Sequence, residues 1–263
     1  MFPGFNLGSL FISSYSICAL IGIFTAFPLS FIRYKRLTGG YYPLAVVCIW
    51  AAVGVFLGMH LLYGITNISE WGLLFSAESF GEFAELFGDI FGGAVFYGGL
   101  IGGIIAGGIS IYVQKLPPDT ASDCLAPAIA LFHGFARIGC FMAGCCYGIE
   151  HEHGITFTDS IVASANGVPR IPVQLFEAGF EFLLSALLWF LLLKAPKTLG
   201  RLLALYLLIY SVGRFILEFL RGDDYRGFVF GLSTSQFIGI LVFLSSAVFL
   251  AIKISGYKQS RPS

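Results

Sequence analysis

Arginine, histidine, glutamine and glutamate recur at helical spacing in three apolar stretches of the sequence. His133, Arg137 and Cys140 are separated by four and three residues, so a helix would carry them on one face, with Gly144 one turn further on. Two later stretches repeat this spacing with Gln174, Glu177, Glu181, Arg214, Glu218 and Arg221. Charged side chains in apolar surroundings are costly and usually face a cavity or one another. The three faces are therefore the candidate site of chemistry.

The arginines of these faces have two interpretations. Interhelical salt bridges, for example between Arg214 and Glu177, could account for any single pair. Several arginines at one depth exceed what packing needs, and the planar guanidinium is the preferred protein ligand of phosphate. We therefore expect a phosphate-binding site, with ion pairing left open for individual pairs.

The composition is that of a membrane protein. It is 57% hydrophobic and only 11% charged, unlike a soluble globular protein. Lys+Arg and Asp+Glu are both 15, so the net charge gives no argument for a nucleic-acid partner, and we expect none. The first ten residues lack the basic residues that begin a cleaved signal peptide, so the first apolar stretch is expected to be a retained span.

Seven apolar stretches approach the roughly 20 residues that a helix needs to cross about 30 Å of hydrocarbon. They cover about 11–32, 43–64, 91–113, 123–144, 173–193, 201–220 and 231–252. The sequence has no internal repeat and no linker long enough to separate domains. It therefore predicts an all-α, polytopic fold with seven transmembrane helices in a single membrane domain over residues 1–263.

The basic residues between these stretches lie mostly on one side. That side carries ten of them: Arg33, Lys35, Arg36, Lys115, Lys194, Lys197, Arg201, Lys253, Lys258 and Arg261. The other side carries Arg170, Arg221 and Arg226. The positive-inside rule then predicts an N-terminus outside and a cytoplasmic C-terminus. With this orientation Arg137, Arg214 and Glu177 fall in the outer half of the bilayer, where the phosphate of an outer-leaflet lipid is the natural anion.

The loop before the third apolar stretch and the glycines within that stretch each have a structural interpretation. The loop 65–90 has no Lys or Arg, and its phenylalanines Phe80, Phe83 and Phe87 recur at helical intervals, so we expect an extracytoplasmic amphipathic helix at about 76–90. Eight glycines follow: Gly92, Gly93, Gly98, Gly99, Gly102, Gly103, Gly107 and Gly108. Close packing of small residues against another helix is a sufficient explanation for them.

Four segments occur in an order that resembles one known family. They are GGAVFYGGLIGG, HGFARIGCFMAGCCYG, GVPRIPVQLFE and YSVGRFILEFLRGDD, and the resemblance runs from about residue 90 to 240. The chain resembles the bacterial prolipoprotein diacylglyceryl transferases, which have seven spans and an outside N-terminus. The resemblance implies transfer of a diacylglyceryl group from phosphatidylglycerol to the thiol of a prolipoprotein lipobox cysteine, with release of glycerol phosphate. It also implies a bacterial inner-membrane protein with its active site toward the extracytoplasmic leaflet.

The resemblance also implies the site residues. The family's arginine before Ile-Gly corresponds to Arg137, and the closing glycine of its signature to Gly148. Residues expected to act in catalysis are Tyr97, His133, Arg137 and Arg214. Residues expected to bind substrate are Arg137, Cys140, Gly148, Gln174, Glu177, Arg214, Glu218 and Arg221. No cofactor and no metal ion are expected.

Three positions depart from the family pattern. Tyr97 replaces a histidine, Cys140 an asparagine and Cys145 a glutamate. A phenol is a poorer general base at neutral pH than an imidazole. His133 could replace the missing base through a water, since it lies one turn from Arg137. The alternative for His133 is a buried neutral ring bonded to a backbone carbonyl.

The cysteines 140, 145 and 146 have three interpretations: a disulfide, a reactive thiol beside Arg137, or plain packing. Their spacing lacks a CxxC pair, which argues against a zinc site. The departures also leave other functions open. The scaffold could serve a related glycerolipid-group transferase with a different acceptor, or a non-catalytic lipid-binding or transport protein, although the inverted repeats typical of transporters are missing from the sequence.

Overall fold

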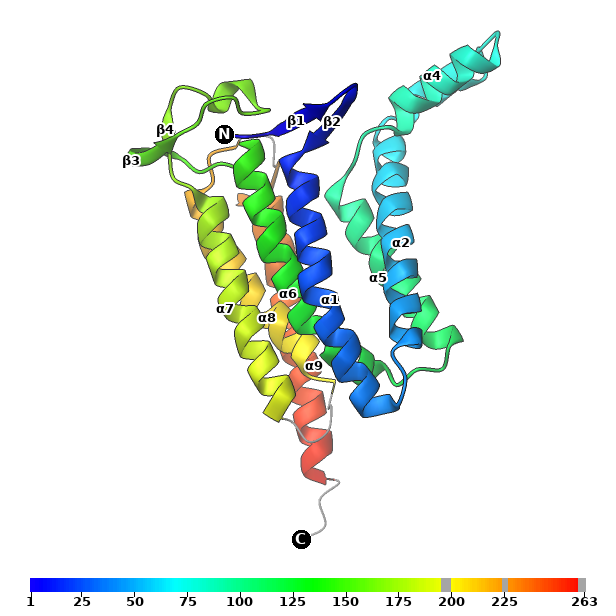
Figure 1. Ribbon diagram of the computed structural model, residues 1–263, viewed down its shortest axis with the longest axis vertical. Coiled ribbons are helices and arrows are strands. Elements are labelled where there is room, and N and C mark those ends of the chain that lie inside the picture. Colours follow the sequence, from blue (N-terminus) through cyan, green and yellow to red (C-terminus); the bar gives the residue numbers. More distant parts are fainter. Residues whose placement is uncertain (195–199, 224–226, 260–263) are drawn as a thin grey trace. The chain divides into compact units, whose positions relative to one another are not determined.

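The computed structural model describes residues 1–194, 200–223 and 227–259, and most of them are helical (Figure 1). The long helices are α1 (Ser14–Thr38), α2 (Tyr42–Thr66), α4 (Phe80–Phe91), α5 (Phe96–Val113), α6 (Pro118–Ala143), α7 (Val173–Lys194), α8 (Leu202–Leu217) and α9 (Thr234–Gln259). Short helical turns are η1 (Ile68–Glu70), α3 (Trp71–Leu74), η2 (Ala163–Ala165) and η3 (Glu218–Leu220). The all-α prediction holds for the main elements.

Within the described ranges, three antiparallel strand pairs that we did not predict from the sequence supplement the helices. They are β1 (Gly4–Leu7) with β2 (Leu10–Ser13), β3 (Glu150–Thr156) with β4 (Pro169–Arg170), and β5 (Phe228–Val229) with β6 (Leu232–Ser233). Hydrophobic periodicity misses these pairs because five of the six strands have only two to four residues, and the seven-residue β3, EHEHGIT, is largely polar.

Among the residues that the structure describes, six helices are long and apolar enough to cross a membrane. They are Ser14–Thr38, Tyr42–Thr66, Pro118–Ala143, Val173–Lys194, Leu202–Leu220 and Thr234–Ser255. The chain is therefore a polytopic membrane protein. The stretch expected at 91–113 forms α5, whose apolar part, Tyr97–Val113, is shorter than these six. The count of seven spans and the orientation of the termini stay predictions.

The described residues divide into two compact units. One contains Met1–Arg33 and Ser122–Ser263, and the other contains Tyr34–Ala121. Of the predicted site residues, Tyr97 belongs to the second unit and all others to the first. The prediction of one membrane domain over residues 1–263 stays a prediction.

In the second unit, α2 and α5 pack backbone to backbone. A Cβ atom at Gly54 would lie 2.3 Å from the Gly102 carbonyl oxygen, and one at Gly58 would lie 2.2 Å from the Gly98 carbonyl oxygen. Both helices thus carry glycines four residues apart at their contact, as small residues do in membrane helix pairs. The close-packing interpretation of the glycines is confirmed for Gly98 and Gly102. It does not hold for Gly108, where a Cβ atom would have nothing within 4 Å.

The expected amphipathic helix is α4, which begins a few residues later than predicted. The Ser79 side chain caps it by accepting a hydrogen bond from the Glu82 backbone N–H at 3.2 Å. The Phe80, Phe83 and Phe87 side chains are exposed within this unit, as expected for a helix whose apolar face meets lipid. Its position at the outer surface stays a prediction.

In the first unit, small residues of α6 and α8 let α7 approach. A Cβ atom at Gly134 would lie 2.4 Å from the Phe182 ring, and one at Gly213 would lie 2.5 Å from the Phe180 ring. The common core of the three helices consists of Ala126, Ala130, Leu184, Leu188 and Tyr206. This packing holds the polar faces of α6, α7 and α8 toward one another.

A buried carboxylate in α6 fixes the start of α8. Asp123 Oδ2 accepts a hydrogen bond from the Gly200 N–H at 2.9 Å, and its Oδ1 accepts one from the Leu202 N–H at 2.8 Å. The first N–H groups of a helix have no partner within the helix, so this carboxylate both satisfies donors and opposes the positive helix end. It ties two site-bearing helices together at the end remote from the site.

Replacing this carboxylate should destabilise the protein without touching the site. We expect Asp123→Asn to lower the unfolding free energy by about 1.5–3 kcal/mol, because an amide removes the charge and one of two acceptors. Thermal unfolding in detergent, followed by circular dichroism, measures this. Glu152→Gln, which alters a side chain that is 82% exposed, is the control and should leave the midpoint unchanged. An Asp123→Asn protein as stable as the parent would contradict the capping role.

Candidate functional site

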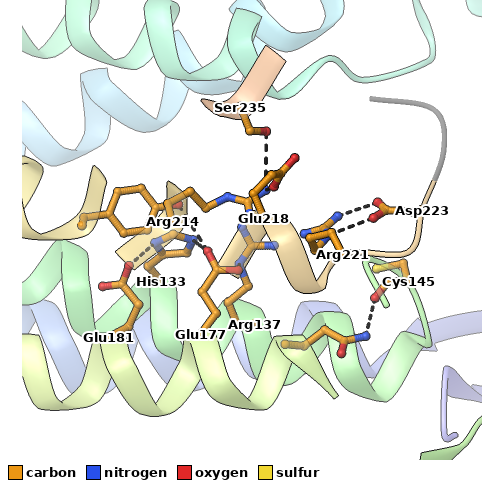
Figure 2. A network of polar contacts seen from close by, with 12 residues as sticks. His133, Arg137, Cys145, Glu177, Glu181, Arg214, Glu218, Arg221, Asp223 and Ser235 are labelled. Atoms are coloured by element: carbon orange, nitrogen blue, oxygen red, sulfur yellow. Dashed lines mark hydrogen bonds and ion pairs between the residues drawn. The ribbon is translucent and has the colours of Figure 1, made fainter. Parts of the chain in front are cut away.

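The polar faces of α6 and α7 meet through two side-chain pairs (Figure 2). His133 Nδ1 lies 2.8 Å from Glu181 Oε1, and Arg137 Nε lies 3.1 Å from Glu177 Oε2. Glu177 and Glu181 are almost fully buried, at 1% and 0% exposure. The two polar faces thus meet, as expected from the four-residue spacing on each helix, and His133 Nε2 also lies 3.9 Å from Glu177 Oε1. The Glu181 carboxylate takes the place of the backbone carbonyl that we considered as the partner of His133.

The face of α8 adds a second arginine–carboxylate contact to this group. Arg214 Nη2 lies 2.7 Å from Glu218 Oε2 and 3.4 Å from Ser235 Oγ at the start of α9. Figure 2 shows Arg214 and Glu218 beside Arg137 and Glu177. Arg214 Nη1 is buried and has no hydrogen-bond partner among the described residues. A buried unused donor is costly, and an anionic ligand would satisfy it.

The salt bridges in the structure differ from the one that we gave as an example from the sequence. Arg214 and Glu177 are not the salt bridge that we considered from the sequence, because Glu177 pairs with Arg137 and Arg214 pairs with Glu218. Glu177 still interacts electrostatically with Arg214. Ion pairing and phosphate binding are compatible here, because a guanidinium has five N–H donors and each of these contacts uses only part of them.

Arg221 lies outside the helix on which we expected it. The helical residues end at Leu220, so Arg221 does not continue the face of Arg214 and Glu218. Its Nε donates to Asp223 Oδ1 at 2.8 Å. Burial alone would lower the pKa of Arg221, but its hydrogen bond with Asp223 and its electrostatic interactions with Asp223 and Cys146 together outweigh this and raise the pKa above its ordinary value. The guanidinium therefore stays charged beside the site.

Gln174 and Gly148 both contact the backbone of neighbouring segments close to these charged side chains. Gln174 Nε2 donates to the Cys145 carbonyl oxygen at 2.7 Å, and Gln174 is 1% exposed. A Cβ atom at Gly148 would lie 2.5 Å from the Ile171 carbonyl oxygen. The backbone of Gly148 also forms an isolated antiparallel β-bridge with that of Arg221. Both residues therefore hold the segment that follows α6 in place.

Tyr97 and the cysteines complete the expected set. Tyr97 lies in the first turn of α5 and is half-buried within the second unit. Its role in the site stays a prediction. Cys140, Cys145 and Cys146 are free thiols whose sulfur atoms gather within 4.8 Å of one another. Of the three interpretations, the structure has no disulfide between these cysteines, and the reactive thiol and plain packing both stay predictions.

Several polar residues around the site were not in the predicted set. The Tyr206 hydroxyl lies 3.4 Å from Glu181 Oε1, and the Tyr210 hydroxyl lies 3.3 Å from Glu177 Oε1. A signal for both exists in the sequence, because residues 206, 210, 214 and 218 follow one another at intervals of four. Asp223 and Ser235 have no such signal, because each lies outside the spacing of the α8 face.

Comparison with known proteins gives the family. The family model of prolipoprotein diacylglyceryl transferase matches residues 4–252. A phosphatidylglycerol–prolipoprotein diacylglyceryl transferase of Clostridium tetani is 39% identical over 91% of this chain and 92% of its own length. A second such transferase, from Clostridium perfringens, is 37% identical over 97% of both chains, and one from Bordetella parapertussis is 31% identical over 92% of this chain and 91% of its own. The chain thus belongs to the prolipoprotein diacylglyceryl transferase family.

Proposed function

We propose that this protein transfers the diacylglyceryl group of phosphatidylglycerol to the cysteine thiol of a prolipoprotein lipobox and releases glycerol phosphate. The observation that carries the proposal is a group of two half-buried arginines and a half-buried histidine, each held by a buried carboxylate, inside a membrane protein. The names of its relatives state the same donor and acceptor. An anion-binding part and a proton-accepting part are what this transfer requires.

The anion-binding part consists of Arg137 and Arg214. Their carboxylate partners Glu177 and Glu218 orient the guanidinium groups, and Arg214 Nη1 is a buried donor without a partner among the described residues. In the transfer, negative charge grows on the phosphate as its bond to the glyceryl carbon breaks. Preoriented donors in a water-poor site stabilise that charge.

The proton-accepting part is His133. Its Nδ1 is held at 2.8 Å by Glu181, and a carboxylate there keeps the proton on Nδ1 and leaves Nε2 able to accept one. His133 is one turn from Arg137 on α6, so a water between them can carry the proton of the acceptor thiol to Nε2. Gln174, Gly148, Cys140 and Arg221 shape the segment that borders this group.

The finer architecture belongs to the proposal as well. We place seven spans in the bacterial inner membrane, with the N-terminus outside, the C-terminus in the cytoplasm and the site toward the outer leaflet. This rests on the ten-to-three distribution of basic residues. It gives both substrates, a phospholipid and a membrane-inserted signal peptide, access from the same leaflet.

Labelling of intact cells tests this topology. A cysteine introduced in the loop 65–90 should react with a membrane-impermeant maleimide, and a reporter fused after Ser263 should behave as cytoplasmic. A cysteine placed after Ser263 is the matched control and should react only after the cells are permeabilised. External labelling at the C-terminus would contradict the orientation.

Purified protein tests the function directly. Phosphatidylglycerol labelled in the headgroup glycerol should release labelled glycerol phosphate when a lipobox peptide is present, and the peptide should gain the mass of a diacylglyceryl group. A peptide with serine in place of the lipobox cysteine is the control and should give no release. Release that is equal with both peptides would indicate another acceptor. Lipid binding without release would favour a non-catalytic role.

A further inference from the structure

Three thiols at the C-terminal end of α6 take no part in the anion binding or the proton transfer of the proposed function. The Sγ atoms of Cys140, Cys145 and Cys146 all lie within 4.8 Å of one another, and all three are free. Cys140 is buried and the other two are half-buried. Their sequence spacing lacks a CxxC pair, so the fold and not the spacing brings them together.

The turn that ends α6 brings Cys145 close to Cys140. Gly144 has a φ of 79°, its N–H donates to the Phe141 carbonyl at 3.1 Å, and the Cys145 N–H donates to the Cys140 carbonyl at 3.1 Å. These are the two hydrogen bonds of a Schellman motif. In this motif the N–H of the second residue beyond the helix end, here Cys145, donates to the carbonyl five residues earlier, here that of Cys140. Cys145 therefore folds back onto Cys140.

The left-handed backbone conformation of Cys146 places its thiol next to the other two. Cys146 has a φ of 60°, in the left-handed region that non-glycine residues rarely adopt and that is enriched at functional sites. The surrounding structure holds this conformation, because Gln174 bonds the Cys145 carbonyl and Gly148 is tightly packed. The three side chains are thus positioned before any ligand arrives.

The spacing of the thiols suits a small thiophilic metal ion. Zinc–sulfur bonds of about 2.3 Å in a tetrahedral site put the sulfur atoms about 3.8 Å apart, so small side-chain movements suffice. Three thiolates around Zn²⁺ leave one net negative charge. Arg221 and Arg137 interact electrostatically with Cys146 and can compensate that charge.

We propose that Cys140, Cys145 and Cys146 bind a zinc ion whose fourth position receives the acceptor thiol; this inference rests on the proposed function. In the described ranges 1–194, 200–223 and 227–259, no His, Asp or Glu joins the three cysteines as a fourth ligand. Structural zinc sites close with four protein ligands, whereas catalytic sites keep three and one open position. Cys140 lies one turn from Arg137, so this position borders the phosphate-binding part.

The transfer then runs as follows. The acceptor sulfur coordinates zinc and loses its proton, because a thiol bound to zinc ionises readily. Its electron pair forms the C–S bond to the glyceryl carbon, and the C–O bond to phosphate breaks with its electrons going to that oxygen. The thiol proton passes through water to His133 and ends on the released glycerol phosphate. Zinc keeps its oxidation state, so the step needs no oxidant or reductant.

The first test measures the metal site without activity. Protein purified in detergent without chelator should contain about one zinc per chain by elemental analysis, and its cluster thiols should react with maleimide only after chelation. Co²⁺ in place of zinc should give thiolate charge-transfer absorption. Cys146→Ser should lose the metal, and Cys48→Ser, in α2, should keep it. Zinc-free protein, or thiols released by a reductant and not by a chelator, would overturn the proposal in favour of an empty cluster or a disulfide.

The second test measures the role in transfer. Removal of zinc should lower kcat/KM for the lipobox peptide about 100-fold or more, and added zinc should restore the parent protein but not Cys146→Ser. Unchanged turnover after complete removal of zinc would overturn the inference while leaving the proposed function intact. Absence of transfer in zinc-loaded protein would instead overturn the proposed function, and the zinc and thiol measurements would still decide whether the metal site exists.

Discussion

Arg137→Lys should reduce transfer from phosphatidylglycerol by about 10²–10³-fold, the loss seen when one donor to a developing oxyanion is removed. The substitution keeps the charge but replaces a planar fork of five donors by a single ammonium group. Because the Arg137 Nε lies 3.1 Å from Glu177, the lysine must also choose between this carboxylate and the lipid phosphate. Headgroup release from labelled phosphatidylglycerol, normalised to the protein present in the membrane, measures the loss.

A matched control separates this role from a structural one. The Arg33 guanidinium donates to the Leu192 carbonyl at 2.9 Å and lies outside the site, so Arg33→Lys should retain near-normal turnover. If Arg137 served only as an interhelical ion pair, Arg137→Lys would accumulate poorly yet turn over normally per molecule. Normal turnover with normal accumulation would exclude a phosphate role for Arg137.

The sequence predicted which faces would meet, because polar residues three and four positions apart on an apolar helix can only face inward. His133 and Arg137 on α6 contact Glu181 and Glu177 on α7 as that pattern implies. It could not predict which carboxylate each arginine takes, since this depends on the rotation and offset of neighbouring helices. These in turn follow from contacts such as the one between Gly134 and Phe182.

Features beyond the helix ends were harder to predict from the sequence. Arg221 was assigned to a helical face because its spacing from Glu218 is three, but the helical residues end one position before it. The thiol cluster depends on a Schellman turn and on the left-handed conformation of Cys146. Glycine at position 144 hints at the turn. A left-handed cysteine has no sequence signal, since the surrounding packing imposes it.

His133 should prove more important for turnover than Tyr97, which occupies the place of the family's histidine. We expect His133→Gln to lower kcat by about 10²–10⁴-fold, the contribution of general acid–base catalysis. The glutamine amide can still donate to Glu181, which is 0% exposed and would keep only the Tyr206 hydroxyl, 3.4 Å away, after His133→Ala. Tyr97→Phe should cost about ten- to a hundredfold, mainly in KM for the lipid, because it removes one hydrogen bond to a charged headgroup, about 1.5–3 kcal/mol.

Steady-state kinetics at saturating lipid separate these roles, because a lost headgroup contact is overcome by lipid concentration and a lost base is not. Tyr210→Phe is the control for His133, since it removes a hydroxyl that lies 3.3 Å from Glu177 while leaving the His133–Glu181 pair intact. It should retain most of kcat. If His133→Gln turns over normally and Tyr97→Phe abolishes the reaction at saturating lipid, the base is Tyr97, and a nearby cation must make its phenol acidic enough to act. If both variants keep normal kcat, coordination of the acceptor thiol by zinc suffices for its ionisation, and the proton leaves to solvent without a side-chain base.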